Sequence, residues 1–114
     1  GLKRSTAAFR GMFDRFDLVL TPTLAHTTPE IGYLDPAGDF ADTFERLTRY
    51  VAFTPANNTS GTPAISLPLG QTATGLPIGI HFMADLGKER SLLELAFELE
   101  AAQPFARIQD ASGR

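Results

Sequence analysis

The chain of 114 residues has 10 Lys plus Arg and 13 Asp plus Glu. Because the basic residues are few and scattered along the sequence, we expect no nucleic acid as a partner. It contains no cysteine, which excludes a disulfide framework, a thiolate zinc site and a cysteine nucleophile. Hydrophobic residues make up 43% of the chain, enough for one globular domain, but no run approaches the roughly twenty apolar residues of a membrane span, so we expect a cytoplasmic protein without a membrane partner.

The first forty residues predict a helix, a short strand and a long loop. Four large apolar residues recur at helical spacing and would share one face of a helix over residues 3–15: Phe9, Met12, Phe13 and Phe16. Residues 17–22 form a short apolar run that ends in a proline, which is typical of a buried strand. Residues 23–39 carry proline and glycine turn signals and no periodicity, so we expect a long ordered loop.

A second amphipathic helix and a short third helix are expected next. Apolar residues again repeat at helical spacing over residues 40–53: Phe40, Phe44, Leu47 and Val51. A short helix over residues 55–60 would follow, because Thr54 is a good N-cap residue and Pro55 suits the first helical position. Gly61 can adopt the left-handed conformation that often ends a helix.

The last part of the chain predicts two strands and a helix. Residues 64–69 and 78–83 are the strand candidates, and a polar turn with glycines joins them. Pro68 has no backbone N–H, so it marks a strand end or a sheet edge. A leucine-rich stripe predicts a helix over residues 89–102, which Pro104 closes.

A search for catalytic chemistry finds no nucleophile beside a base, so we assign no catalytic residue. No serine sits in a Gly-x-Ser-x-Gly elbow or a Ser-x-x-Lys pair. Lys88 and Ser91 could form a dyad at a helix start, but an exposed first turn explains them better. His26 and His81 lie far apart without clustered carboxylates, so we expect no metal site, and a hydrogen-bonded structural role for His81. No glycine pattern fits a dinucleotide or phosphate site, so we expect no cofactor.

Three sequence blocks, taken together and in order, carry a resemblance to a known family. They read FDLVLTPT at residues 16–23, FTPANNTSGTPAISLP at residues 53–68 and GLPIGIHF at residues 75–82. With the closing helix at residues 92–100, they resemble the C-terminal third of the amidase-signature family. The resemblance covers nearly the whole chain, and the ordered combination is specific although each block alone is a weak signal.

The resemblance implies an α/β fold with a mixed sheet and helices on both faces, of which this chain would hold about three strands and their flanking helices. Residues 1–103 would be the C-terminal part of an amidase domain and residues 104–114 a polar tail. Family members hydrolyse carboxamide C–N bonds with a serine activated through a second serine and a lysine, all in the family's N-terminal half. These three residues have no counterpart here. The chain would therefore supply scaffold and part of the substrate pocket, and would be inactive alone.

The resemblance also points to a substrate pocket at the turn before the Asn-x-x-Gly block. In the amidotransferase branch of the family, an acidic residue on this turn reads the α-amino group of the substrate, and Val51 is the nearest match here. An apolar residue there argues against an amino-acid amide. Tyr50, Val51 and Thr54 are the candidates for the pocket wall, with core packing as the alternative role of Val51. Asn58 is expected to bond nearby backbone at the end of the short helix.

Two interpretations of the whole chain remain. In the first, it is a fragment of an amidase, and its partners are a small-molecule amide substrate and the N-terminal part of the same protein. In the second, it is a self-standing binding or interaction module on the same scaffold, which a natural start codon near Gly1 would support. Without the N-terminal elements, apolar strands would leave an exposed patch and unpaired edges, so we expect self-association of the isolated chain.

Overall fold

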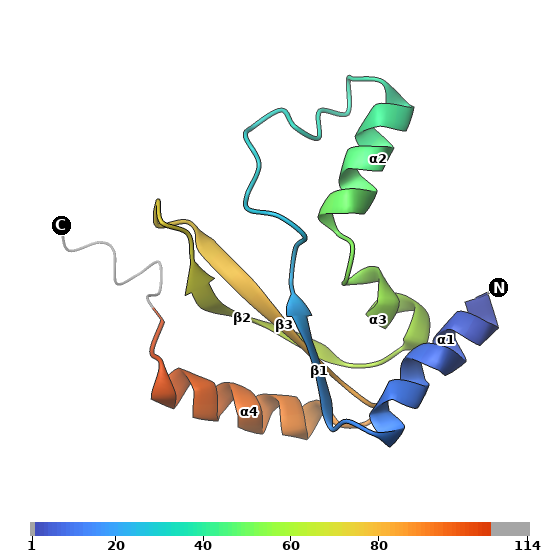
Figure 1. The fold of residues 1–114 in the computed structure, drawn as a ribbon, viewed down its shortest axis with the longest axis vertical. Coiled ribbons are helices and arrows are strands. Elements are labelled where there is room, and N and C mark those ends of the chain that lie inside the picture. Colours follow the sequence, from blue (N-terminus) through green and yellow to red (C-terminus); the bar gives the residue numbers. More distant parts are fainter. Residues whose placement is uncertain (1, 106–114) are drawn as a thin grey trace.

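The computed structural model describes residues 2–105 as an α/β arrangement of helices around a small sheet (Figure 1). The four helices and three strands that the sequence predicts are confirmed, and the first helix continues into a 3-10 helix, η1. In chain order the elements are α1 (Leu2–Arg10), η1 (Gly11–Asp14), β1 (Leu18–Pro22), α2 (Phe40–Tyr50), α3 (Pro55–Ser60), β2 (Ala64–Gln71), β3 (Pro77–Ala84) and α4 (Glu89–Ala102). Most of the predicted tail lies outside the described residues.

The three strands form one sheet in the order β1-β3-β2, and β3 pairs antiparallel with both neighbours. Leu20 and Ile65 both lie opposite Phe82, so these three residues share one face of the sheet. The resemblance implied a mixed sheet, and this part of the chain contributes three strands that pair only in the antiparallel sense. The strand order places β3 in the centre, with an outer strand on each side.

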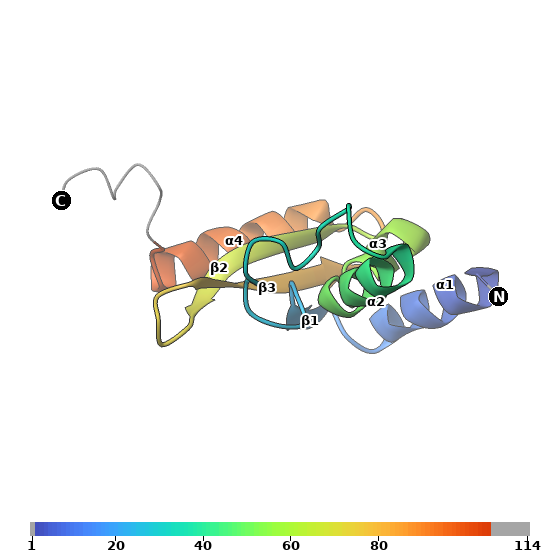
Figure 2. The ribbon, with the colours of Figure 1, turned by 90° about the horizontal axis from the view of Figure 1, so that it is seen from above.

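The core lies between one face of the sheet and α4, which runs along that side of the sheet in Figure 2. Its buried centre consists of Leu67, Phe82, Ala84 and Leu92. Further half-buried apolar residues pack against this centre: Leu18, Ile65, Leu69, Ile80, Leu95, Ala96 and Leu99. The leucine stripe of α4 therefore covers the apolar face of β3, as its helical spacing predicts.

Two predicted helices are shorter than their apolar stripes. The α-helix expected over residues 3–15 ends at Arg10, where Gly11 begins η1, because glycine weakens an α-helix and 3-10 turns commonly end one. The helix expected over residues 40–53 ends at Tyr50. Its last carbonyl, that of Tyr50, accepts a hydrogen bond of 3.0 Å from the Ala25 N–H of the long loop. This tertiary hydrogen bond occupies the carbonyl that would accept the Thr54 N–H if the helix continued.

The short helix α3 ends as predicted but begins differently. Gly61 has a φ of 74° and donates its N–H to the Asn57 carbonyl, 2.8 Å away, which confirms the left-handed helix end. The predicted side-chain cap by Thr54 is wrong. Thr54 has helical dihedrals and makes no capping bond with its side chain, while its carbonyl accepts the Asn57 N–H at 3.2 Å. The N–H groups of Ala56 and Asn57, which a capping side chain would bind, instead donate to the carbonyls of Phe53 and Thr54.

The amide that bonds backbone at the end of α3 belongs to Asn57 and not to Asn58. Asn57 is buried, and its Nδ2 donates to the Thr62 carbonyl at 3.2 Å and to the Thr62 hydroxyl at 3.0 Å. Asn58 is exposed. The helical turn decides this, because it directs position 57 toward the protein and position 58 toward solvent.

Pro68 lies inside β2, which continues to Gln71. The register of β2 against β3 shifts between Leu67 and Gly70, so Pro68 sits at an irregularity of an outer strand. A proline costs little there, because the ladder is already interrupted. The expectation of a sheet edge is confirmed, and the expectation of a strand end is wrong.

Helix α2 stands away from the sheet (Figure 1), and its apolar stripe is exposed. The side chains of Phe40, Phe44 and Leu47 are 80%, 54% and 39% exposed, and the two phenylalanine rings stack 5.7 Å apart. Among residues 2–105, no helix combines the length and apolar character needed to cross a membrane. The stripe is therefore a surface feature of this part of the chain.

We predict opposite stability effects for two glycine-to-alanine substitutions. Gly61→Ala should lower the free energy of unfolding by about 1–2 kcal/mol, because an L-residue is strained at positive φ. Gly11→Ala is the control, since Gly11 lacks positive φ and a methyl group added there would meet no atom within 4 Å. Gly11→Ala should be neutral or stabilising. Urea unfolding measures both, and equal losses would contradict the assignment of Gly61 as the helix end.

Candidate functional site

The three candidates for the pocket wall lie on the connection between α2 and α3. Tyr50 is the last residue of α2, Val51 follows it, and Thr54 precedes α3. All three are half-buried. The Ala25 N–H donates to the Tyr50 carbonyl at 3.0 Å, which ties the loop of residues 23–39 to this connection.

Three rings from two elements meet beside this connection, and we call them the aromatic cluster: His26, Tyr33 and Tyr50. The His26 ring lies 4.7 Å from the Tyr50 ring and 5.6 Å from the Tyr33 ring, in tilted and edge-on geometry. Arg46 of α2 places its guanidinium 5.6 Å from the Tyr33 ring centre and donates to the Tyr33 carbonyl at 3.3 Å. The cluster and Arg46 therefore hold the loop on α2, with an energy typical of aromatic and cation–π pairs.

A cavity of about 210 Å³ opens beside His26. It lies between the loop after β1 and the start of β3, and its walls are Pro22, Leu24, Ala25, His26, Thr27, Thr28, Pro77, Ile78 and Gly79. None of these residues carries a permanent charge. No sequence signal indicates this cavity, because the two segments that form it are about fifty residues apart and neither is periodic.

Polar side chains cross the face of the sheet opposite α4. The hydroxyls of Thr23 and Ser66 are 2.6 Å apart, and the Thr21 hydroxyl lies 3.3 Å from Nδ1 of His81. His81 is only 4% exposed, and burial lowers its pKa from the ordinary value for histidine. The expected hydrogen-bonded structural role of His81 agrees with this geometry, since its ring is buried and bonded to a threonine.

Among the serines whose side chains are described, Ser60, Ser66 and Ser91, none has a base as its hydrogen-bond partner. Ser60 bonds the Ala56 carbonyl and the Thr62 hydroxyl, and Ser66 bonds Thr23. Ser91 is exposed, as is Lys88 before it. Within residues 2–105, no three His, Asp or Glu side chains gather in a way that could hold a metal ion.

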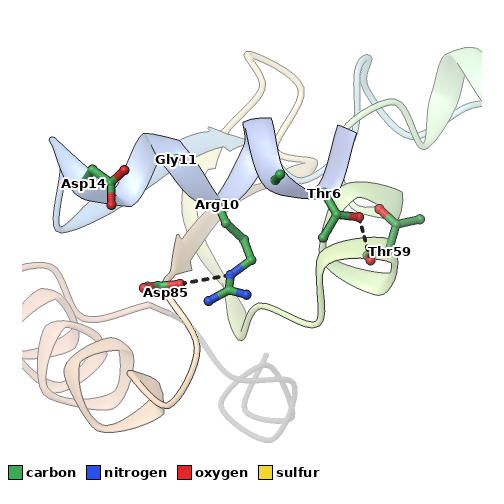
Figure 3. A pocket seen from close by; sticks show the side chains of 7 residues that line it. Thr6, Arg10, Gly11, Asp14, Thr59 and Asp85 are labelled. Atoms are coloured by element: carbon green, nitrogen blue, oxygen red, sulfur yellow. Dashed lines mark hydrogen bonds and ion pairs between the residues drawn. The ribbon is translucent and has the colours of Figure 1, made fainter. Parts of the chain in front are cut away.

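A second cavity, of about 600 Å³, lies between α1, α3 and the end of β3 (Figure 3). Thr6 donates to the Thr59 carbonyl at 3.2 Å, and Arg10 lies 3.7 Å from Asp85. Asp14 also lines this cavity. Tyr50, Val51 and Thr54, the candidates for the pocket wall, do not line this cavity. Both interactions join α1 to neighbouring elements and are solvent-exposed, so they add little to stability.

Comparison with known proteins finds a family model and relatives that match most of the chain. The family model described as Amidase matches residues 2–93. The chain is 56% identical, over 95% of its length, to AmiC of Mycobacterium leprae (strain TN), which is named as an amidase. It is 41% identical, over 79% of its length, to the 6-aminohexanoate-cyclic-dimer hydrolase of Paenarthrobacter ureafaciens. The chain spans only 22% and 20% of these two relatives.

Solved structures agree with the sequence relatives. A structure of a 6-aminohexanoate cyclic dimer hydrolase matches 97% of this chain with a TM-score of 0.84 and 35% identity, and the match covers 25% of that enzyme. A bacterial aryl acylamidase of the amidase signature family matches 99% of this chain with a TM-score of 0.76 and 28% identity, over 24% of its own length. The arrangement of helices and strands described above is therefore the one these enzymes share.

We predict that His81 makes the stability of the protein depend on pH. Because burial lowers its folded-state pKa below 6.5, the unfolded chain takes up this proton first as the pH falls. The contribution of the neutral imidazole is fully present above pH 6.5 and is lost as the pH falls toward the folded pKa. His81→Gln should flatten the fall in unfolding free energy below pH 6.5. His26→Gln is the control at an exposed histidine, and an unchanged slope in His81→Gln would reject the prediction.

Proposed function

The chain belongs to the amidase family, and from this we propose that it is the C-terminal part of a hydrolase that cleaves carboxamide C–N bonds. The observation that carries the proposal is the family match over residues 2–93, together with 56% identity to AmiC along 95% of the chain. Since the chain spans 22% of that relative, the remaining parts of the enzyme would lie outside it. Residues 1–103 would form the amidase part and residues 104–114 a tail, in a cytoplasmic enzyme that uses neither a nucleic acid nor a membrane as partner.

This part of the enzyme would supply scaffold and a wall of the substrate pocket. Tyr50, Val51 and Thr54 are half-buried on one connection, and the Ala25–Tyr50 hydrogen bond holds that connection in place. A wall fixed in this way keeps its geometry when substrate binds, which favours catalysis. Val51 offers no negative charge, so the proposed substrate is a small amide without an α-ammonium group at this position.

The catalytic groups would come from the N-terminal part of the same protein. Amide hydrolysis needs an activated nucleophile and donors for the oxyanion. Ser60 and Ser66 are bonded to carbonyls or hydroxyls, Ser91 is exposed, and none of these three is bonded to a base. The chain would therefore depend on a serine, a second serine and a lysine supplied from outside it.

One feature supports contact with further parts of the protein. The stripe of Phe40, Phe44 and Leu47 is exposed on α2, and a continuous apolar face of a helix is normally covered. A segment with an apolar surface from the N-terminal part would bury this stripe.

The alternative is a self-standing binding or interaction module on the same scaffold. The aromatic cluster favours it, because three rings held on one surface can bind a ligand without any catalytic group. The reading frame distinguishes the two. A Gly/Ser-rich segment and a lysine encoded upstream of Gly1 support the amidase, and a start codon at Gly1 supports the module.

We predict that the 114-residue chain hydrolyses neither acetanilide nor propionamide above the rate in buffer, since it lacks an activated nucleophile. The product of the complete reading frame should hydrolyse at least one of them. Release of aniline or ammonia measures the two reactions. Turnover by the short chain that disappears in Ser91→Ala would overturn the assignment of the catalytic groups, and an inactive complete protein would overturn the proposed function.

We also predict that the isolated chain self-associates through the α2 stripe. Light scattering at micromolar concentrations should show a dimer or a larger species, and Phe44→Ser should shift it toward a monomer that binds a hydrophobic dye. Phe16→Ser is the matched control, because Phe16 is exposed to the same extent, 54%, outside α2. A compact monomer of the unmodified chain that binds no dye would reject the prediction and favour the self-standing module.

A further inference from the structure

The cavity beside His26 has the size and polarity of a site for a small uncharged group. Its volume of about 210 Å³ exceeds the roughly 150 Å³ that suffices to hold benzene in an apolar protein cavity. Leu24, Ala25 and Ile78 line it together with the polar but uncharged Thr27 and Thr28. A ligand with a full charge would lose its hydration here and find no opposite charge among the lining residues.

His26 connects this cavity to the proposed pocket wall. Its ring lines the cavity and lies 4.7 Å from the Tyr50 ring, at the end of α2. Its Nδ1 atom lies 2.8 Å from the Thr27 carbonyl, and because a carbonyl oxygen only accepts, Nδ1 is the donor. In the neutral imidazole, Nε2 then carries a lone pair and can accept a hydrogen bond. No hydrogen-bond partner of Nε2 is found among the described residues.

The ring of His26 is also held in position. Tyr33 contacts it edge-on at 5.6 Å, and Arg46 holds Tyr33 through a hydrogen bond to its carbonyl. The Ala25 N–H, one residue before His26, is bonded to the Tyr50 carbonyl. A ring fixed on several sides loses little freedom on binding a ligand, which raises affinity.

We propose that this cavity binds an uncharged, ring-sized substituent of the amide substrate, and that His26 stacks on it and accepts a hydrogen bond at Nε2 from an N–H or O–H of the ligand. The identification of the ligand as part of an amide substrate rests on the proposed function. The binding site itself rests on the cavity, the position of His26 and the absence of charge among the nine lining residues.

The test uses the complete protein and four probes that contain no amide, of which toluene has neither a charge nor an O–H donor. Benzyl alcohol is neutral with one O–H donor, and benzoate and benzylammonium are its charged analogues. Ligand-observed NMR at neutral pH gives the dissociation constants. Benzyl alcohol should bind about tenfold more tightly than either ion, because the cavity offers no opposite charge.

Variants of His26 separate the stacking from the hydrogen bond. His26→Ala should weaken benzyl alcohol binding by about tenfold, from the loss of a ring contact and a hydrogen bond. His26→Phe keeps a ring in the aromatic cluster and should weaken benzyl alcohol but leave toluene unchanged. Glu98→Ala, at an exposed position of α4 away from the cavity, is the control and should change neither probe.

Each result decides between the site and its absence. Equal binding of the ions and the alcohol, or unchanged benzyl alcohol binding in both His26 variants, would overturn the site. Because the probes contain no amide, the two proposals fail separately. If the protein binds benzyl alcohol but hydrolyses no amide, the site stands and the proposed function is rejected. If the protein hydrolyses an amide but does not bind benzyl alcohol, the proposed function stands and the site is rejected.

Discussion

The position of β3 between two outer strands is the constraint on which the rest of the structure depends. β3 pairs with β1 on one edge and β2 on the other, and its last four residues are buried. Gly79 of β3 leaves room for a hydrogen bond between Thr23, which follows β1, and Ser66 of β2. A Cβ at this position would lie 2.6 Å from the Thr23 hydroxyl and 2.9 Å from the Ser66 hydroxyl, so only glycine leaves room for the hydrogen bond between them without a shift. The side chain missing at position 79 thus permits a bond between two segments that are not neighbours in the sheet.

This bond also fixes the start of the loop that forms the candidate site. Thr23 is held twice, by its hydroxyl on Ser66 and by its N–H on the Gly79 carbonyl at 2.9 Å. Three residues later the chain reaches His26, and the Ala25 N–H joins it to the end of α2. The cavity lined by Gly79 and His26 is therefore set by the sheet on one side and by α2 on the other. A change in the central strand would move the aromatic cluster even though none of its rings lies in a strand.

The sequence predicted the elements better than the contacts between them. Apolar spacing located α2 and α4, and glycine at position 61 identified the end of α3, because these signals act over a few residues. It could not predict tertiary contacts such as the hydrogen bond from the Ala25 N–H to the Tyr50 carbonyl, because the two residues are far apart in the chain. The pocket candidates came from the family resemblance, and the neighbouring His26 could not be found from spacing, because its contacts lie on a loop without periodicity. Thr54 shows a further limit, since a good capping residue makes no capping bond when its own backbone is helical and backbone carbonyls already bind the N–H groups of the first turn.

Two independent features agree on the kind of amide that this part of an amidase would accept. In the proposed pocket wall, Val51 would present an apolar side chain where an acidic residue would attract an ammonium group, and the cavity beside His26 is lined by residues without permanent charge. The two lie on different segments, joined through the Tyr50 carbonyl and the Ala25 N–H. If only one of these two surfaces were uncharged, a charged substituent of the substrate could still pair with an opposite charge on the other. With both uncharged, an ionic substituent would lose its hydration without compensation, whereas a neutral one would gain the contacts of the rings. Selectivity for neutral amides would then follow from the walls of the pocket, apart from the chemistry of the nucleophile.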